Sequence, residues 1–256
     1  MPELSIVIPT LGNHAGLARA LDALETQGPL ERFEVLVVAD AAEPEPERVT
    51  ALAAARPYAV RSLRGRIPGA SANRNEGWRR ADAPVVLFMD DDTLAMPGLV
   101  DGHLAWHHRH PQAETGVLGH VRWARELNVT TFMHWLDHGV QFGYPAIKGV
   151  DAGWSHFYTA NASVKRELLE DLGGFDEERL PYLYEDLDLA YRARGRGFRL
   201  LYNREAEVEH LREMDLDYWR RKMPRLAAAE RTFVELHPDF PPYFYEMFTA
   251  ACPAPP

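Results

Sequence analysis

The sequence feature that most constrains the fold is an apolar segment that ends in three acidic residues. Pro-Val-Val-Leu-Phe-Met at 84–89 runs directly into Asp90, Asp91 and Asp92. The segment shows no polar alternation, which is typical of a strand buried on both faces of a sheet. Adjacent carboxylates repel one another unless a cation compensates them, and Mg²⁺ or Mn²⁺ is the simplest candidate. A solvated acidic turn is the alternative interpretation.

Strand and helix patterns alternate along the chain, which predicts an α/β fold with a mostly parallel central sheet flanked by helices. Because ligands of open α/β sheets bind at the carboxyl ends of strands, the acidic cluster marks the expected site. The expected strands cover residues 4–9, 33–39, 58–63 (at an edge), 84–89, 116–121, 157–164, 198–202 and 207–210. Helices are expected after Asn13, at 48–55, from 72, at 97–109, after a cap at Asn128, before Gly173, from Glu185 and from Met214.

Composition excludes some classes of function. The formal net charge of −10 argues against general nucleic-acid binding, which needs a basic face. Cys252 is the only cysteine, so no intrachain disulfide can form and a reducing compartment is expected. The N-terminal residues have no leader pattern and no apolar run reaches membrane-spanning length. We therefore expect a cytoplasmic protein.

Several short motifs follow one another in an order that resembles a known family. They are Ile6-Val7-Ile8-Pro9-Thr10, Asp40 after the second strand, Asn73-Arg74-Asn75, the cluster Asp90–Asp92, Asn161-Ala162-Ser163, Gly173-Gly174-Phe175-Asp176-Glu177, Glu185-Asp186 and His210. Each motif alone is weak, but the ordered set, from Leu4 to about His210, resembles a family 2 glycosyltransferase. The resemblance implies the GT-A fold of nucleotide-diphospho-sugar transferases.

The resemblance also implies a reaction: inverting transfer of a sugar from a nucleotide-diphosphate donor to an acceptor hydroxyl. Asp186 is then the general base, and Glu185 orients it or the acceptor. Mn²⁺ or Mg²⁺ would stabilise the leaving diphosphate. Its direct protein ligand would be Asp92, with Asp90 nearer the ribose or reaching the metal through water. His210 would complete the metal shell, with a surface cap as the alternative. The nucleotide would contact Pro9, Thr10, Asp40, Arg74, Asn75, Asp90 and Asp91, although Arg74 would otherwise be a surface ion pair.

Other reactions and roles compete with this interpretation. A haloacid-dehalogenase-type phosphotransferase also has Asp-x-Asp at a strand end, but needs threonine where this chain has Leu94. A sugar-phosphate nucleotidyltransferase normally has a glycine-rich basic loop after its first strand, and Pro9-Thr10-Leu11-Gly12-Asn13 is not such a loop. A non-catalytic nucleotide-sugar-binding protein would not need Asp186.

Three further features suggest binding surfaces. Trp154, Tyr158, Tyr182 and Tyr184 offer flat faces for sugar stacking or for core packing. The loop 139–153 is glycine-rich and aromatic, as in a lid over a ligand. His103 and His107 lie one helical turn apart, which suits either a metal pair or, more simply, a solvated helix face.

The sequence divides into three parts. Residues 1–110 are expected to be the nucleotide-sugar-binding half of one GT-A domain, 111–211 the acceptor-binding and catalytic half, and 212–256 a helical extension and tail. Tyr218, Trp219, Arg220, Arg221, Lys222, Met223 and Arg225 in the extension suit packing on this acidic protein, a homodimer contact, or weak peripheral contact with the inner membrane face. UDP or dTDP is slightly favoured over GDP in the donor, and the acceptor is a carbohydrate or lipid-linked molecule.

Overall fold

The computed structural model describes residues 1–54, 56–139 and 141–251, and its centre is one eight-stranded sheet. The strands lie in the order β3-β2-β1-β4-β7-β6-β8-β5. Pairs β1–β2, β1–β4, β2–β3 and β6–β8 are parallel, and β4–β7, β6–β7 and β5–β8 are antiparallel. The strands are β1 Leu4–Thr10, β2 Phe33–Ala39, β3 Ala59–Arg64, β4 Val85–Met89, β5 Thr93–Ala95, β6 Thr115–Trp123, β7 Asn161–Lys165 and β8 Arg199–His210. The predicted mixed, mostly parallel sheet is confirmed.

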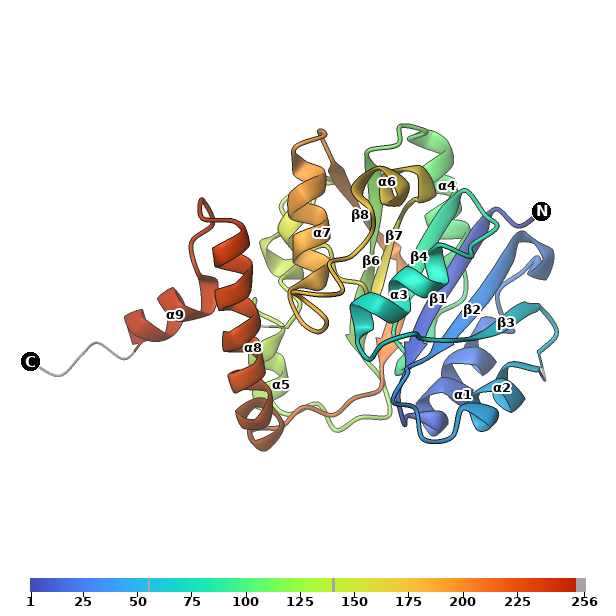
Figure 1. Ribbon diagram of the computed structural model, residues 1–256, viewed down its shortest axis with the longest axis horizontal. Helices are drawn as coiled ribbons and strands as arrows, with labels where there is room; N and C mark the ends of the chain where they lie inside the picture. Colours follow the sequence, from blue (N-terminus) through green and yellow to red (C-terminus); the bar gives the residue numbers. More distant parts are fainter. Residues whose placement is uncertain (55, 140, 252–256) are drawn as a thin grey trace, which may run out of the picture.

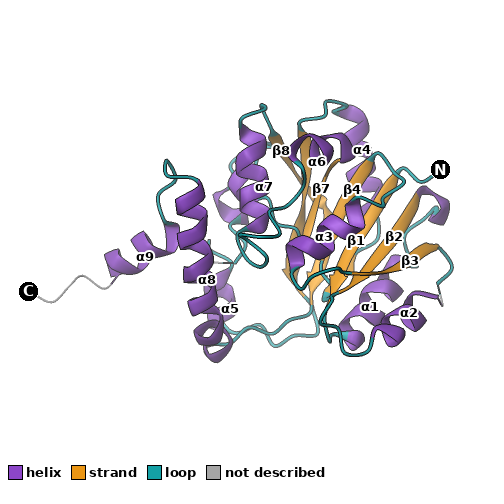
Figure 2. Cartoon of the chain, in the orientation of Figure 1, coloured by secondary structure: helices purple, strands orange, loops and turns teal. Residues whose placement is uncertain are grey.

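Helices cover the sheet and extend beyond one side of it. In Figures 1 and 2, α3, α6 and α7 lie in front of the sheet, and α8 and α9 lie past α7 toward the C-terminus. The helices are α1 His14–Leu24, α2 Pro46–Ala54, α3 Ala70–Trp78, α4 Leu99–Arg109, α5 Thr131–Leu136, α6 Arg166–Leu172, α7 Glu185–Arg194, α8 Leu216–Leu236 and α9 Tyr243–Ala251. Short 3₁₀ turns occur at Leu30–Arg32, Tyr144–Ala146 and Trp154–His156. No helix in the described part of the chain is long and apolar enough to cross a bilayer.

The structure corrects four details of the expected elements. The strands expected at 198–202 and 207–210 form the single strand β8, whose pairing with β6 is irregular between Gly119 and His120. Strand β7 begins at Asn161, four residues later than expected. The hydroxyl of Thr130, and not the side chain of Asn128, caps α5. The three-residue strand β5 was not predicted, and Ala55, the expected end of α2, lies outside the described residues.

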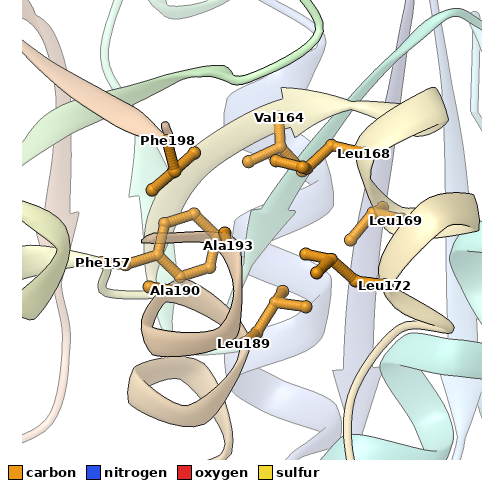
Figure 3. A pocket seen from close by; sticks show the side chains of 9 residues that line it. All are labelled: Phe157, Val164, Leu168, Leu169, Leu172, Leu189, Ala190, Ala193 and Phe198. Atoms are coloured by element: carbon orange, nitrogen blue, oxygen red, sulfur yellow. The ribbon is translucent and has the colours of Figure 1, made fainter. Parts of the chain in front are cut away.

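The layer formed by β7, α6 and α7 is apolar and closely packed. A small void within it, whose lining side chains Figure 3 shows, has a volume of about 10 Å³, about one water molecule. The side chains around it carry no polar group; they are Phe157, Val164, Leu168, Leu169, Leu172, Leu189, Ala190, Ala193 and Phe198. This void is therefore a packing defect and not a ligand site, and the layer provides a rigid base for α7.

A chain of buried polar groups fixes α4 against β7. The Lys165 ammonium lies 2.8 Å from His107 Nδ1, and both His107 Nε2 and His103 Nδ1 lie 2.8 Å from the Ser163 hydroxyl. His103 Nε2 then lies 2.9 Å from Asn161 Oδ1. With both rings neutral, every donor in this series meets an acceptor, and burial lowers the pKa of His103 to about 4. His103 and His107 are fully buried, so neither the solvated face nor the metal pair describes them.

A second apolar cluster joins the C-terminal helices to α5 and α7. Phe233 of α8 is fully buried and contacts the rings of Tyr184, Tyr191 and Phe240. The hydroxyl of Tyr184 donates a 2.7 Å hydrogen bond to Glu230 of α8. Because Tyr184 directly precedes α7, this cluster sets the position of α8 relative to the first residues of α7.

Candidate active site

The predicted site residues surround one large cavity of about 1270 Å³. The carboxyl ends of β1, β2 and β4 form one wall, and residues of α8 and α9 form another. Of the predicted nucleotide, metal and catalytic residues, those that line it are Pro9, Thr10, Asp40, Arg74, Asp90, Asp91, Asp92, Glu185, Asp186 and His210. Asn75 does not line it. The aromatic candidates Trp154, Tyr158, Tyr182 and Tyr184 all do.

Asp91 is directed back toward β1. Its carboxylate accepts hydrogen bonds from Thr10 Oγ1 at 2.7 Å and Asn13 Nδ2 at 3.0 Å. Burial raises the pKa of Asp91 to about 6, opposed by the bond from Asn13 and reinforced by the charge of Asp92. Both oxygens of Asp91 therefore have hydrogen-bond partners in the protein. In this structure, Asp91 joins the acidic cluster to β1.

Asp92 is brought to His210 by the short strand β5. Thr93 pairs with His210 across the antiparallel β5–β8 ladder, and Leu211 N–H donates to the Asp92 carbonyl at 2.8 Å. The Asp92 carboxylate lies 3.7 Å from His210 Nε2 and 2.7 Å from Arg212 Nε. The cation next to Asp92 is therefore a guanidinium of the same chain.

The donor types of Asp90 and Asp92 fit a hard divalent cation, whereas His210 fits it less well. Both side chains offer carboxylate oxygens at the cavity wall. His210 Nδ1 accepts the Arg212 backbone N–H at 3.2 Å, so its Nε2 carries the ring proton, and burial lowers the pKa of the ring. Ligation through Nε2 would require the other tautomer. Within the described ranges, no group of three His, Cys, Asp or Glu residues is arranged to hold a metal.

Arg74 bridges the acidic cluster and the first residue of α7. Its guanidinium lies 3.0 Å from Asp90 Oδ1 and 2.7 Å from Glu185 Oε1. Arg74 is 4% exposed, so it is not the surface ion pair considered from the sequence; it lines the cavity, and its contact with the nucleotide stays a prediction. Glu185 Oε2 is buried and has no hydrogen-bond partner in the described structure. This bridge fixes Glu185 relative to Asp90.

Asp40 is held by the helix start that the sequence singled out. Its Oδ2 accepts from Gly69 N–H at 2.9 Å and from Asn73 Nδ2 at 2.7 Å. Asn73 lines the cavity and its Oδ1 is buried without a partner, which makes it a binding candidate that the sequence interpretation missed. Asn75 instead binds the backbone of Phe175 through both ends of its amide, at 2.9 Å each. Of the two asparagines beside Arg74, the first lies at the cavity and the second supports a loop.

Asp186 lies half-buried at the start of α7, just after two residues with a strained backbone. The two residues before Glu185, Leu183 and Tyr184, have left-handed backbone conformations with φ of 62° and 64°. Asp186 Oδ1 accepts the Leu187 N–H at 2.8 Å. Burial and, to a smaller extent, the Glu185 carboxylate raise the pKa of Asp186 to about 7, against the opposing charge of Arg74. A carboxylate that titrates near neutrality can accept a proton from a bound hydroxyl.

The loop expected to be a lid lies at the same cavity. Gly139, Gln141, Phe142, Gly143 and Ala146 line it. The side chains of Phe142, Tyr144 and Ala152 are nevertheless buried, and Tyr144 OH donates to the Gly119 carbonyl at 3.1 Å. These contacts anchor the described part of the loop to β6.

The sheet and its carboxylate-lined cavity define the fold class as the GT-A fold. The model described as "Glycosyltransferase like family 2" matches residues 2–229, and the chain belongs to this family. Its structure is similar to mannosyltransferase PcManGT from Pyrobaculum calidifontis, solved with GDP-Man and Mn²⁺ (TM-score 0.68, 20% identity, 94% of this chain and 65% of that one). It is also similar to Staphylococcus aureus TarS residues 1–349 with UDP-GlcNAc (TM-score 0.62, 16% identity, 90% of this chain and 66% of that one).

Curated relatives are similar at the level of sequence. A validoxylamine A glucosyltransferase of Streptomyces hygroscopicus is 27% identical over 288 residues, which cover 96% of this chain and 63% of the relative. YfnE of Bacillus subtilis, described as an uncharacterized glycosyltransferase, is 24% identical over 256 residues, or 81% of this chain and 64% of the relative. The chain thus spans less than two thirds of the length of these relatives.

Proposed function

We propose that this chain is an inverting glycosyltransferase that moves a sugar from a nucleotide-diphosphate donor to an acceptor hydroxyl. The observation that supports this most directly is the presence of Asp186 in the cavity that also contains Asp90 and Asp92. A base with a raised pKa and a pair of acidic residues suited to a diphosphate–metal complex are the two groups that such a transfer needs.

In the proposed reaction the acceptor oxygen attacks the anomeric carbon as its proton passes to Asp186. The bond between that carbon and the diphosphate oxygen breaks, and the diphosphate leaves with the electron pair. Glu185, held by Arg74 at 2.7 Å, positions the acceptor or Asp186. Trp154, Tyr158, Tyr182 and Tyr184 supply ring faces on which sugars stack.

Asp90 and Asp92 would hold Mn²⁺ or Mg²⁺. When bound there, the ion supplies positive charge that stabilises the leaving diphosphate. Asp40 and Asn73 would hold the nucleoside, with Pro9 and Thr10 beside it. Relatives of similar fold were solved with GDP-Man and Mn²⁺ and with UDP-GlcNAc, so both guanosine and uridine donors merit testing along with dTDP sugars. The acceptor class remains a carbohydrate or lipid-linked hydroxyl.

A ligand panel tests this proposal. Thermal unfolding is measured with UDP, GDP and dTDP and their common sugars, each with Mn²⁺, Mg²⁺ or a chelator, because a ligand that binds only the folded state raises the melting temperature. We expect a metal-dependent rise for one nucleotide family, and slow release of nucleoside diphosphate from the matching sugar donor. No rise with any nucleotide in the presence of metal would contradict the proposal.

A further inference from the structure

Three cations on one helix face the cavity without an acidic partner. Arg221, Lys222 and Arg225 of α8 line it. None of the three lies within ion-pair distance of a carboxylate in the described part of the chain. In a protein with 38 acidic and 28 basic residues, carboxylates are abundant, so unpaired cations gathered on one cavity wall need another explanation.

Aromatic rings position two of these cations. Lys222 Nζ lies 4.8 Å from the centre of the Trp219 ring, and Arg225 Cζ lies 5.2 Å from the centre of the Tyr182 ring. A ring face attracts a cation by about 0.5–2 kcal/mol but does not neutralise its charge. Burial, together with the positive charge of Arg212, lowers the pKa of Lys222, as expected of a cation that has no anion beside it.

The cations of α8 and the acidic residues at the strand ends line the same cavity. The carboxylates of Asp186, Glu185 and Asp90 partly oppose the lowering of the Lys222 pKa, so Lys222 lies near the proposed reaction centre. Arg225 packs on Tyr182, and burial together with the charge of Asp40, at the proposed nucleoside end, raises the pKa of the Tyr182 hydroxyl. Residues 222 and 225 are neighbours on the same helix face, separated by about 4.5 Å along the axis. A ligand in the cavity would therefore meet both the acidic groups at the strand ends and this basic face of α8.

We propose that Arg221, Lys222 and Arg225 form a phosphate-binding subsite on α8. Guanidinium and ammonium groups are the side chains that bind phosphate oxygens, and the cavity leaves these three open to a ligand. The phosphate comes either from the diphosphate of the donor or from a phosphate group on the acceptor. Only binding of the donor diphosphate at this subsite depends on the proposed function.

Charge-removing variants test the subsite. Lys222→Met and Arg225→Met retain most of the aliphatic stem, and Lys222→Glu reverses the charge. Arg231→Met on the same helix, and Arg220→Met, whose partner is Asp217 at 3.3 Å, are matched controls that do not line the cavity. Calorimetric titrations in the presence of Mn²⁺ use UDP, GDP and dTDP and the corresponding nucleosides. A second series titrates inorganic phosphate into protein saturated with the diphosphate that binds.

If the subsite holds the donor, we expect each Met variant to bind nucleoside diphosphate at least tenfold more weakly, Lys222→Glu to be weaker still, and nucleoside binding and both controls to be unchanged. If it holds an acceptor phosphate, diphosphate binding stays constant and the variants lose only the binding of inorganic phosphate. Unchanged binding in both series, with folded variants, overturns the subsite. Absence of nucleotide binding by the unsubstituted protein would instead overturn the proposed function, and the phosphate series without nucleotide would still test α8.

Discussion

Carboxylates in this cavity occupy different environments, and these environments decide what each can do. Asp91 accepts hydrogen bonds from Thr10 of β1 and from Asn13, the residue before α1, and Asp92 is paired with Arg212. Asp186 is half-buried beside another acid, and in the described structure its carboxylate accepts a hydrogen bond from a neighbouring backbone N–H. Asp186 is therefore the acid of this group that is best suited to exchange a proton near neutral pH.

Removing that base should stop transfer while leaving the fold intact. Asp186→Asn keeps the oxygen that accepts the Leu187 N–H, so we expect a loss of about 10²- to 10⁴-fold in kcat with little change in nucleotide affinity. Since the base acts when deprotonated and its pKa is about 7, kcat/KM of the unsubstituted enzyme should rise about tenfold per pH unit below 7 and level off above it. Exposed Asp217→Asn is the control; equal transfer by Asp186→Asn would assign the base elsewhere.

Arg212 competes with a divalent cation for Asp92. Because Arg212 is 44% exposed on its side chain, its pair with Asp92 is worth at most about 1 kcal/mol, and Arg212→Met should raise Mn²⁺ affinity by up to about fivefold. Electron paramagnetic resonance of free Mn²⁺ measures this without a turnover assay. Asp92→Asn should abolish the binding, and a weaker affinity in Arg212→Met would show that the arginine supports the ion.

Much of the candidate site could be predicted from the sequence because acids that follow buried strands reach one edge of a parallel sheet. Asp40 and Asp90–Asp92 illustrate this. The partners of these acids could not be predicted, since they come from distant segments: Arg74 joins Glu185 across 111 residues, and Arg212 joins Asp92 across 120. Asn73 and Asn75 are two residues apart on α3, so their side chains point to different faces of the helix, and the sequence does not show which of these faces the cavity.

At the scale of elements, the sequence patterns that succeeded are the long ones. Strands β1, β2 and β4 were found near their observed bounds because each is a continuous apolar segment, and helix α4 because a proline precedes it at a position suited to a first turn. Strand β5 has only three residues, and nothing in its composition separates it from a turn; it exists because β8 pairs with it. The inward direction of His103 and His107 was missed because polar residues on a helix usually face solvent, and here Ser163 and Asn161 satisfy them.

Removing the Ser163 hydroxyl at the centre of the buried hydrogen-bond series between α4 and β7 should lower the free energy of unfolding. Ser163→Ala would leave His103 Nδ1 and His107 Nε2 without their partner, and each unsatisfied buried group costs about 1–3 kcal/mol. We expect urea denaturation to show a loss of about 2 kcal/mol or more in unfolding free energy. Ser62→Ala, which removes only a hydrogen bond on the surface, is the control and should change stability by less than about 0.5 kcal/mol.

At the scale of the whole molecule, two apolar clusters stabilise different parts of the protein. The larger one holds the sheet and its covering helices, and the smaller one attaches α8 and α9 beside the cavity. One sheet extends through residues 4–210, so the proposed donor and acceptor halves share it. The division at 110 and 211 remains a prediction about function, which the binding experiments above address.

Removing a buried ring from one cluster or the other should therefore have different effects on nucleoside diphosphate binding. Phe233→Ala and Phe33→Ala each remove a buried ring, and each should cost about 3–5 kcal/mol of stability. Only Phe233→Ala should weaken nucleoside diphosphate binding, because Phe233 packs on Tyr184 and sets the position of α8. Equal losses of affinity in both variants, measured by calorimetry below the melting temperature, would show that the effect is global.

The junction between Asp92 and Thr93 restricts how the gene can change in length. No linker residue separates the acidic cluster from β5, whose first residue pairs with His210. A codon inserted there would shift β5 by one position and turn its side chains to the opposite face, or pull Asp92 out of the cavity. Insertions at the exposed residues 111–112, between α4 and β6, would leave the site unchanged, so length variation among natural and engineered forms should be found there and be absent after Asp92.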